Sequence, residues 1–341
     1  MIFGFLGAYT MDKKASMTAR PKQRIFFLGA TGTIGRATVR ILVAQGHDVV
    51  CFVRSRNALS NPDLAGAEIR IGDVLDSSSL RDEGFRGEYF DAVVSTLASR
   101  TGVPTEAWSI DYGAHVNALK LAQDMQITRF VLLSALCVQK PRLAFQHAKL
   151  AFESELMASG LTYSIVRPTA FFKSLSGQIR RVKAGKPYLI FGNGQLTSCK
   201  PISDQDLGHY LASCLHDCDK RNKVLPIGGP GLPITPREQG EMIFAALGRT
   251  PKFQSVPLAL LKSIRATLSL LGRFNGRMAD KAEMAAIGLY YGTESMLVLD
   301  PETGRYNGDV TPSTGQDTLQ NYFERLIRNE IADDRGDHAV F

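Results

Sequence analysis

The sequence predicts an α/β protein with a doubly wound parallel sheet, helices on both faces of that sheet, and a smaller C-terminal lobe. From Arg24 onward, short runs of β-branched and aromatic residues alternate with longer helical patterns, as successive βαβ units do. A glycine-rich turn follows the first of these runs directly. After Pro168 the regular alternation stops, and this change marks the beginning of the second part.

Strands and helices can be placed along the chain from the same patterns. In the first part we expect strands at residues 24–29, 47–53, 67–73, 90–96, 129–135 and 162–168, and helices at 34–45, 107–124 and 143–159. In the second part we expect helices at 171–182, from 204, at 235–247, and over 257–291 and 315–329. Further strands are expected at 188–194, near 199–203 and at 223–229.

Composition excludes several classes of protein. The 341 residues are 44% hydrophobic, enough to fill a sizeable core. The five cysteines lack CxxC spacing, which argues against a disulfide framework or a zinc site and favours a reducing compartment such as the cytoplasm. The sequence contains no stretch of about 18 uncharged apolar residues, so we expect no membrane-spanning helix. The net charge of +7 is dispersed and accompanies no nucleic-acid-binding motif, so we expect no nucleic-acid partner.

The strongest motif is FLGATGTIGRATV, which runs from the end of the first strand into a helix. Gly29 permits a tight turn, Gly32 removes a side chain that would block a phosphate, and Gly35 lets strand and helix pack closely. The diphosphate of a dinucleotide would lie at the helix N-terminus, where unpaired N–H groups favour an anion. The sequence therefore predicts a Rossmann-type dinucleotide site whose loop also includes Thr31, Thr33 and Ile34.

The end of the second strand indicates which dinucleotide binds. Arg54 stands where a carboxylate would bind the adenosine ribose, and Arg56 follows closely. Guanidinium groups suit a 2′-phosphate, so NADPH is favoured over NADH, although two solvated surface arginines would give the same pattern. Asp73 and Val74 are expected to flank the adenine. The path to the nicotinamide ribose is expected to be lined by Ser95, Thr96 and Leu97.

Several stretches resemble the extended, atypical short-chain dehydrogenase/reductase superfamily, which includes NmrA-like proteins: GATGTIG, DAVVSTLAS, FVLLSA and SIVRPTAFF. Three longer stretches narrow the resemblance to the divinyl chlorophyllide a 8-vinyl-reductase family: ALCVQKPRLAFQHAKLAFE, IGGPGLPITPREQGEMIF and YYGTESMLVLDPETGRY. This resemblance covers nearly the whole chain. It implies NADPH-dependent reduction of the 8-vinyl group of 3,8-divinyl (proto)chlorophyllide a to ethyl, a step of chlorophyll and bacteriochlorophyll biosynthesis that serves photosynthesis.

The patterns along the chain divide it into an N-terminal extension (1–23), an NADP-binding domain (24–170) and a mixed substrate-binding lobe (171–341) that lends some strands and helices to the sheet. The resemblance assigns Lys149 to the nicotinamide ribose and Ser134 to a position beside the nicotinamide. Pro168 and Thr169 would flank the carboxamide.

The superfamily's tyrosine is missing, because Phe145 occupies the position four residues before Lys149. In ketone reduction that phenol protonates an alkoxide. Hydride addition to a conjugated vinyl group spreads charge over the macrocycle instead, so no oxyanion needs an immediate donor. Phe145 would then present an apolar face to the nicotinamide or the pigment, or pack with Phe152 in a buried stripe. No residue stands out as the proton donor, and a water molecule could serve.

The pigment is a flat apolar plate with a carboxylate, and Phe171, Phe172 and Lys173 offer a matching mixture after the sixth strand. A buried aromatic pair with a solvated lysine is the alternative. Residues 257–281 form an amphipathic basic helix pattern. Its apolar face would pack on the lobe's own core or lie on an anionic photosynthetic membrane.

A second function stays open at this point. An NmrA-like regulator would bind NADP(H) on the same fold without catalysis, and the absent tyrosine would then be expected. The stretch YYGTESMLVLDPETG argues against that alternative. A reductase of a plant-type phenolic double bond is a third possibility.

Overall fold

The computed structural model describes residues 21–332, so most of the predicted extension (1–23) lies outside the described residues. Seven strands form one parallel sheet in the order β3-β2-β1-β4-β5-β6-β8, which confirms the predicted doubly wound fold. The strands are β1 (Arg24–Leu28), β2 (Asp48–Val53), β3 (Glu68–Ile71), β4 (Ala92–Ser95), β5 (Arg129–Leu133), β6 (Thr162–Pro168) and β8 (Lys223–Ile227). The order reverses between β1 and β4, and ligands of such sheets bind at this switch point, outside the carboxyl ends of the strands.

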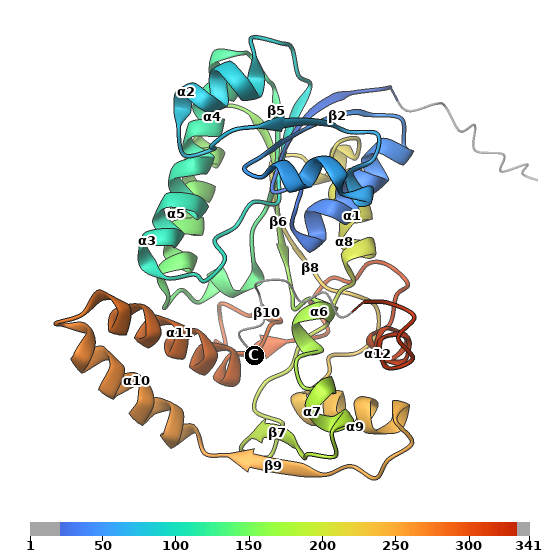
Figure 1. The fold of residues 1–341 in the computed structure, drawn as a ribbon, viewed down its shortest axis with the longest axis vertical. Coiled ribbons are helices and arrows are strands. Elements are labelled where there is room, and N and C mark those ends of the chain that lie inside the picture. Colours follow the sequence, from blue (N-terminus) through green and yellow to red (C-terminus); the bar gives the residue numbers. More distant parts are fainter. Residues whose placement is uncertain (1–20, 333–341) are drawn as a thin grey trace, which may run out of the picture.

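Helices cover both faces of the sheet (Figure 1). One face packs against α1 (Thr33–Ala44) and α8 (Asp204–Ser213). The other packs against α4 (His115–Asp124) and α5 (Ala144–Ala158). Because the strands are buried on both faces, they consist of nearly continuous apolar residues such as RIFFL in β1.

Short helical segments complete the connections of this half. They are 3-10 turns at Arg56–Ser60, Pro62–Leu64, Leu136–Gln139 and Cys218–Lys220, the short helices α2 (Ser77–Ser79) and α3 (Pro104–Glu106), and π-helical turns at Leu80–Phe85 and Ala107–Ala114. We call residues 24–170 and 203–227 the sheet half.

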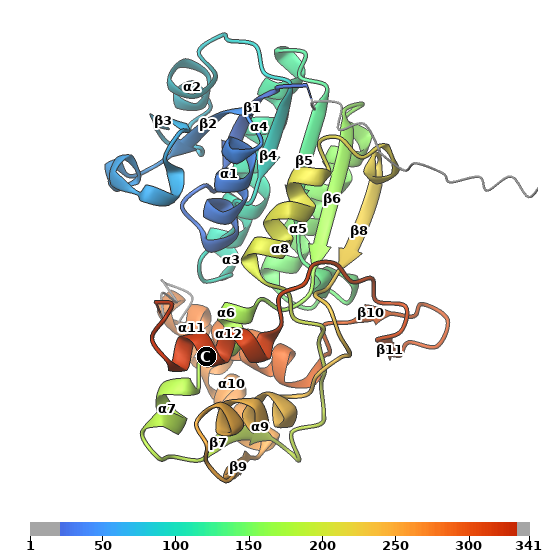
Figure 2. The ribbon, with the colours of Figure 1, turned by 90° about the vertical axis from the view of Figure 1, so that its right-hand side faces the viewer.

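Residues 171–202 and 228–332 form what we call the lobe. Figure 2 shows β6 and β8 pointing toward it, so the lobe lies at the carboxyl ends of the strands. Its apolar core is built by α6 (Phe172–Leu175), α7 (Ile179–Lys183), β7 (Tyr188–Phe191), α9 (Pro236–Ala246), β9 (Phe253–Val256) and α12 (Leu319–Ile327). The helices α10 (Leu258–Gly272) and α11 (Gly276–Thr293) form a hairpin beside it, and the strands β10 (Val298–Leu299) and β11 (Tyr306–Asn307) follow.

Besides the strands β9, β10 and β11, which were not predicted, the lobe differs from the predicted pattern in three places. The helix expected over 171–182 is broken into α6 and α7, because the Gln178 side chain bonds to both the N–H and the carbonyl of Leu189 in β7. Residues 199–203 form isolated bridges to separate segments and no strand. The helix over 257–291 is two helices, since the side chain of Asn275 caps a new N-terminus by accepting from Arg277 N–H.

Candidate active site

The glycine-rich loop has the shape that a dinucleotide diphosphate requires. Gly29 has a φ of 81°, and a Cβ added there would lie 2.5 Å from the backbone nitrogen of Leu97. A Cβ on Gly35 would lie 2.1 Å from the carbonyl oxygen of Gly29. Gly32 is exposed, and a Cβ on it would meet only that same oxygen, at 3.5 Å. The loop is therefore packed tightly on its inner side and open on its outer side, where α1 begins.

The loop after β4 contacts the glycine-rich loop directly. The hydroxyl of Thr96 donates to the Gly29 carbonyl at 3.1 Å, and Leu97 is half-buried beside it. Ser95 is fully buried, and its hydroxyl donates to Nε2 of His115 at 2.8 Å. Ser95 thus fastens the loop after β4 to His115 of α4. Within the loop itself, Thr31 is exposed, Thr33 half-buried and Ile34 buried.

The residues expected around the adenosine follow β2 and β3, the two strands at one edge of the sheet. Arg54 and Arg56 are exposed directly after β2, and Arg56 begins the 3-10 turn that Ser55 caps. Asp73 is exposed after β3 and accepts from Leu75 N–H, whereas the neighbouring Val74 is buried in the core. Only Val74 has a side chain that is mostly used for packing.

Lys149 takes part in an ion pair that the sequence did not predict. Its Nζ lies 2.8 Å from Oδ1 of Asp111, whose side chain is 0% exposed, while that of Lys149 is 11% exposed. Asp111 belongs to the π-helical turn before α4, and His115 follows on the same buried face. Burial, together with the nearby charge of Lys149, lowers the pKa of His115 to about 4. His115 is therefore neutral at pH 7, with Nδ1–H donating to the Ile110 carbonyl at 3.0 Å.

Ser134 belongs to a separate buried polar group. Its hydroxyl donates to Glu153, which also forms an ion pair with Arg167 of β6. Thr169 is buried too, with its hydroxyl donating to the Lys200 carbonyl, and Pro168 before it is buried at the end of β6. These contacts fix the carboxyl ends of β5 and β6 next to the lobe.

Phe145 is buried, but not beside Phe152. It packs in an apolar cluster with Ile287 and Tyr290 of α11, whereas Phe152 belongs to the core under α4 and α5. The expected shared stripe is present, because residues seven apart lie on nearly the same face of α5, but about two helical turns separate the two rings and they pack in different clusters. Phe145 therefore joins the sheet half to the α10–α11 hairpin of the lobe.

The three expected pigment contacts do not form one surface. Phe172 is buried in the lobe core, where its ring lies 5.6 Å from that of Tyr322. Phe171 is half-buried against the core of the sheet. The ammonium of Lys173 lies 2.7 Å from Oγ1 of Thr33, the first residue of α1. Lys173 thus reaches the glycine-rich loop from the lobe.

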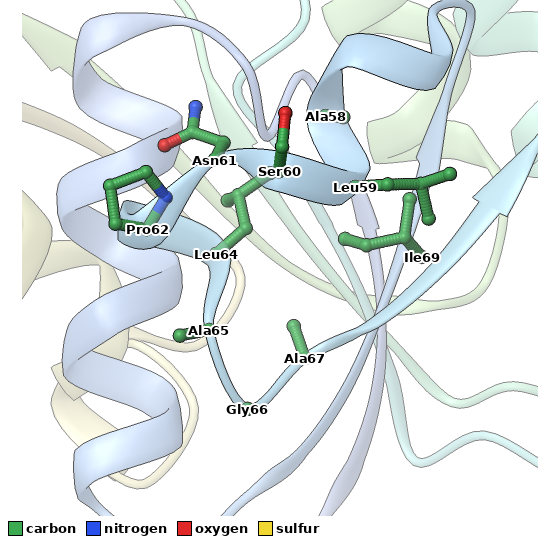
Figure 3. Close-up of a pocket in the computed structure, with 10 residues that line it drawn as sticks. All are labelled: Ala58, Leu59, Ser60, Asn61, Pro62, Leu64, Ala65, Gly66, Ala67 and Ile69. Atoms are coloured by element: carbon green, nitrogen blue, oxygen red, sulfur yellow. The ribbon is translucent and has the colours of Figure 1, made fainter.

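One hollow in the structure lies away from this arrangement (Figure 3). It measures about 330 Å³ and is confined to the connection between β2 and β3. Its lining carries no charged side chain: Ala58, Leu59, Ser60, Asn61, Pro62, Leu64, Ala65, Gly66, Ala67 and Ile69. We assign neither cofactor nor pigment to it. Within residues 21–332, no group of three or more His, Cys, Asp or Glu side chains is placed to hold a metal ion. None of the helices formed by these residues could span a membrane.

Sequence reasoning missed Asp111 and His115. The available signal was their spacing, since a carboxylate and an imidazole four residues apart occupy the buried stripe of an expected helix. It also missed the contact of Lys173 with Thr33, because that contact depends on how the lobe packs against the glycine-rich loop.

Comparisons with known proteins bear on the fold and the family of the chain. A family model described as NAD(P)H-binding matches residues 29–218. The chloroplastic divinyl chlorophyllide a 8-vinyl-reductase of Cucumis sativus is 47% identical over 96% of this chain and 82% of its own. The corresponding protein of Oryza sativa subsp. indica is 45% identical over 99% of this chain and 88% of its own. Among solved structures, the NADPH complex of the Escherichia coli quinone oxidoreductase QOR2 matches with a TM-score of 0.65 at 18% identity, over 89% of this chain and 99% of that one.

The structural match shows the shared fold, and the two reductases show the family. Their similarity extends through the lobe, beyond the residues that the NAD(P)H-binding model covers. The resemblance based on the three long stretches is thus confirmed. The chain belongs to the divinyl chlorophyllide a 8-vinyl-reductase family of NAD(P)H-binding oxidoreductases.

Proposed function

We propose that the protein reduces the 8-vinyl group of 3,8-divinyl (proto)chlorophyllide a to ethyl with NADPH as the reductant. The observation that carries the proposal is the 45–47% identity to reductases named for this reaction, over at least 90% of the chain. The glycine-rich loop and Lys149 supply a cofactor site at the sheet's switch point, as such a reaction needs.

Each part of the cofactor has a candidate partner among the residues of this site. The open side of Gly32 and the N-terminus of α1 suit the diphosphate, and the ammonium of Lys173 at Thr33 adds a positive charge there. Arg54 and Arg56 suit the 2′-phosphate, with Asp73 and Val74 near the adenine. Lys149 suits the nicotinamide ribose, and Ser134, Pro168 and Thr169 border the nicotinamide end. Bound NADPH supplies the hydride.

The environment of Phe145 fits reduction of a carbon–carbon double bond. The hydride goes to the terminal vinyl carbon and a proton goes to the inner carbon, which converts vinyl to ethyl. The charge that develops between the two steps is spread over the macrocycle, so the site does not need a phenol in place of Phe145. The apolar cluster of Phe145, Ile287 and Tyr290 instead excludes water where α5 meets the lobe.

The proposal is tested by incubating the purified protein with NADPH and 3,8-divinyl chlorophyllide a. We expect stoichiometric loss of NADPH absorbance and a small blue shift of the pigment's Soret band. An NmrA-like sensor would bind NADPH and never oxidise it with any pigment of a divinyl chlorin and porphyrin panel. That result, obtained with protein that binds NADPH, would overturn the proposed activity and favour the sensor.

The choice of cofactor is tested separately at Arg54. We expect Arg54→Ala to raise the KM for NADPH by about 30-fold, since a charge-assisted contact to phosphate contributes about 2 kcal/mol. The KM for NADH should change less than twofold. Equal increases for both cofactors would mean that Arg54 does not bind the 2′-phosphate.

We further propose that the protein contacts an anionic membrane surface through residues 257–281. No residue of α10 is buried, which excludes packing of its apolar face in the lobe core. Leu260, Ile264 and Phe274 are among the exposed apolar residues of this stretch, and Phe274 is 88% exposed. From Lys252 to Lys281 there are six basic residues and one acidic residue. Apolar side chains bordered by cations match the surface of an anionic bilayer.

Sedimentation with lipid vesicles tests this contact. We expect the protein to bind vesicles containing phosphatidylglycerol and to remain unbound with phosphatidylcholine alone. Phe274→Ser should weaken binding severalfold, whereas Leu232→Ser, at an 81% exposed leucine outside the stretch, should not. Absent vesicle binding, or a dimer in sedimentation equilibrium that Phe274→Ser dissociates, would exclude the membrane as the occupant of this face.

A further inference from the structure

Burial of the Asp111 carboxylate carries a desolvation penalty that opposes folding. Its side chain is 0% exposed, Oδ1 pairs with Lys149 at 2.8 Å and accepts from Ser99 N–H at 3.3 Å. Its other oxygen, Oδ2, is buried with no hydrogen-bond partner. A buried ion pair with an unsatisfied oxygen adds little or nothing to stability compared with an apolar pair of similar size. The arrangement therefore points to a role other than folding.

Asp111 lies in an unusual helical turn, which sets the position of its side chain. Residues Ala107–Ala114 wind as a π-helix between α3 and α4, and π-helical turns are frequent at functional sites. His115 fastens this turn to the loop after β4, because its Nδ1–H donates to the Ile110 carbonyl and its Nε2 accepts from Ser95. The turn is thus tied to the same loop that touches Gly29.

We propose that Asp111 is a positioning residue that holds the ammonium of Lys149 toward the nicotinamide ribose. The inference rests on the proposed cofactor role of Lys149. A lysine side chain has four rotatable bonds, and a fixed carboxylate at one of its three donors restricts where the other two point. Asp111 itself is inaccessible and acts only through Lys149.

The test compares two ligands that share the adenosine end of the cofactor. NADPH contains the nicotinamide ribose, and adenosine 2′,5′-bisphosphate does not. We expect Asp111→Asn and Lys149→Met each to raise the Kd for NADPH on the order of tenfold, the size of a lost hydrogen bond to a charged group. The Kd for adenosine 2′,5′-bisphosphate should stay unchanged, as measured by titration calorimetry.

A double-mutant cycle shows whether Asp111 acts through Lys149. Asp111→Asn added to Lys149→Met should not weaken NADPH binding further. The double variant has no buried charge left at this site, so it remains testable even if Asp111→Asn alone does not fold. Glu88→Gln is the control, since Glu88 pairs at 2.6 Å with the buried Arg70 outside the site. It should alter neither Kd.

The outcomes separate the two proposals. If Lys149→Met weakens NADPH binding and Asp111→Asn does not, the positioning role is wrong and the cofactor role of Lys149 stands. If Asp111→Asn weakens both ligands, or weakens NADPH further in the Lys149→Met background, Asp111 acts on the fold. If Lys149→Met changes nothing, the proposed role of Lys149 fails, and the inference fails with it.

Discussion

The helices α1 and α10 show how differently the two halves of the molecule are built. Seven of the twelve residues of α1 are buried, whereas none of the fifteen residues of α10 is. Both helices have an apolar stripe in the sequence. In α1 that stripe packs between the sheet and α8, and in α10 much of it faces outward.

The difference teaches which parts of the chain carry stability and which are left for contacts. The sheet half has two apolar cores, one on each face of the sheet. The lobe has one smaller core, and its hairpin reaches the sheet half through the cluster around Phe145. We expect substitutions of apolar core residues in the sheet half to act on folding, and substitutions of the exposed apolar residues of the hairpin to act on membrane binding.

The largest effect should come from a matched pair of leucines. Leu42 of α1 is 0% exposed and Leu260 of α10 is 54% exposed. Leu42→Ala should lower the free energy of unfolding by about 3 kcal/mol, because it leaves a cavity in a packed core. Leu260→Ala should change it by less than about 0.5 kcal/mol. Urea unfolding measures both, and similar losses would contradict the contrast between the halves.

The buried imidazole of the sheet half should make its stability depend on pH. The pKa of His115 is about 4 in the folded protein and 6.5 when unperturbed, and the charges facing it are those of Lys149 and Asp111. Between these values the unfolded chain binds a proton that the folded chain does not. Stability therefore falls as the pH drops below about 6.5, by about 3 kcal/mol once pH 4 is reached.

His115→Gln provides the comparison for this prediction. Glutamine cannot titrate, and it keeps one donor and one acceptor. The difference in unfolding free energy between the two proteins should shrink from pH 7 to pH 4. A constant difference over that range would mean that His115 does not titrate as its burial indicates.

Glycine substitutions separate the fold of the loop from its function. Gly32→Ala should leave the unfolding free energy nearly unchanged, since the added Cβ meets only one atom, at 3.5 Å. It should weaken NADPH binding about 100-fold, because the methyl group occupies the side where the phosphate approaches. Gly276→Ala, at an unobstructed position of α11, should change neither quantity. Unimpaired NADPH binding in Gly32→Ala would exclude this loop as the diphosphate site.

Much of the sheet half could be predicted from the sequence, for a physical reason. A strand buried on both faces must be apolar at every position, and runs such as RIFFL and RFVLL satisfy this locally. The lobe depends on contacts between distant segments. The break at Gln178 requires knowledge of β7, and the bridges of Cys199 require knowledge of Ile234 and Met296.

The candidate site, like the fold, contains parts that the sequence predicts and parts that it does not. The glycine-rich loop could be predicted because its function needs fixed spacing within a few residues. The pairing of Asp111 with Lys149 could not, because it joins two helical segments 38 residues apart in the chain. Phe172 and Lys173 were assigned together to the pigment, yet one side chain points into the lobe core and the other toward Thr33.

The smallest predicted effect concerns the contact that joins the two halves. Lys173 belongs to the lobe, and its Nζ lies 2.7 Å from Oγ1 of Thr33 in the glycine-rich loop. Lys173→Met should raise the Kd for NADPH on the order of fivefold to tenfold, since it removes one cation beside the diphosphate. Lys186→Met, at an exposed lysine of the same lobe, should leave that Kd unchanged. If Lys173 served the pigment carboxylate instead, Lys173→Met would raise the KM for chlorophyllide and leave NADPH binding intact. The two readouts therefore decide whether the lobe helps to hold the cofactor or only the substrate.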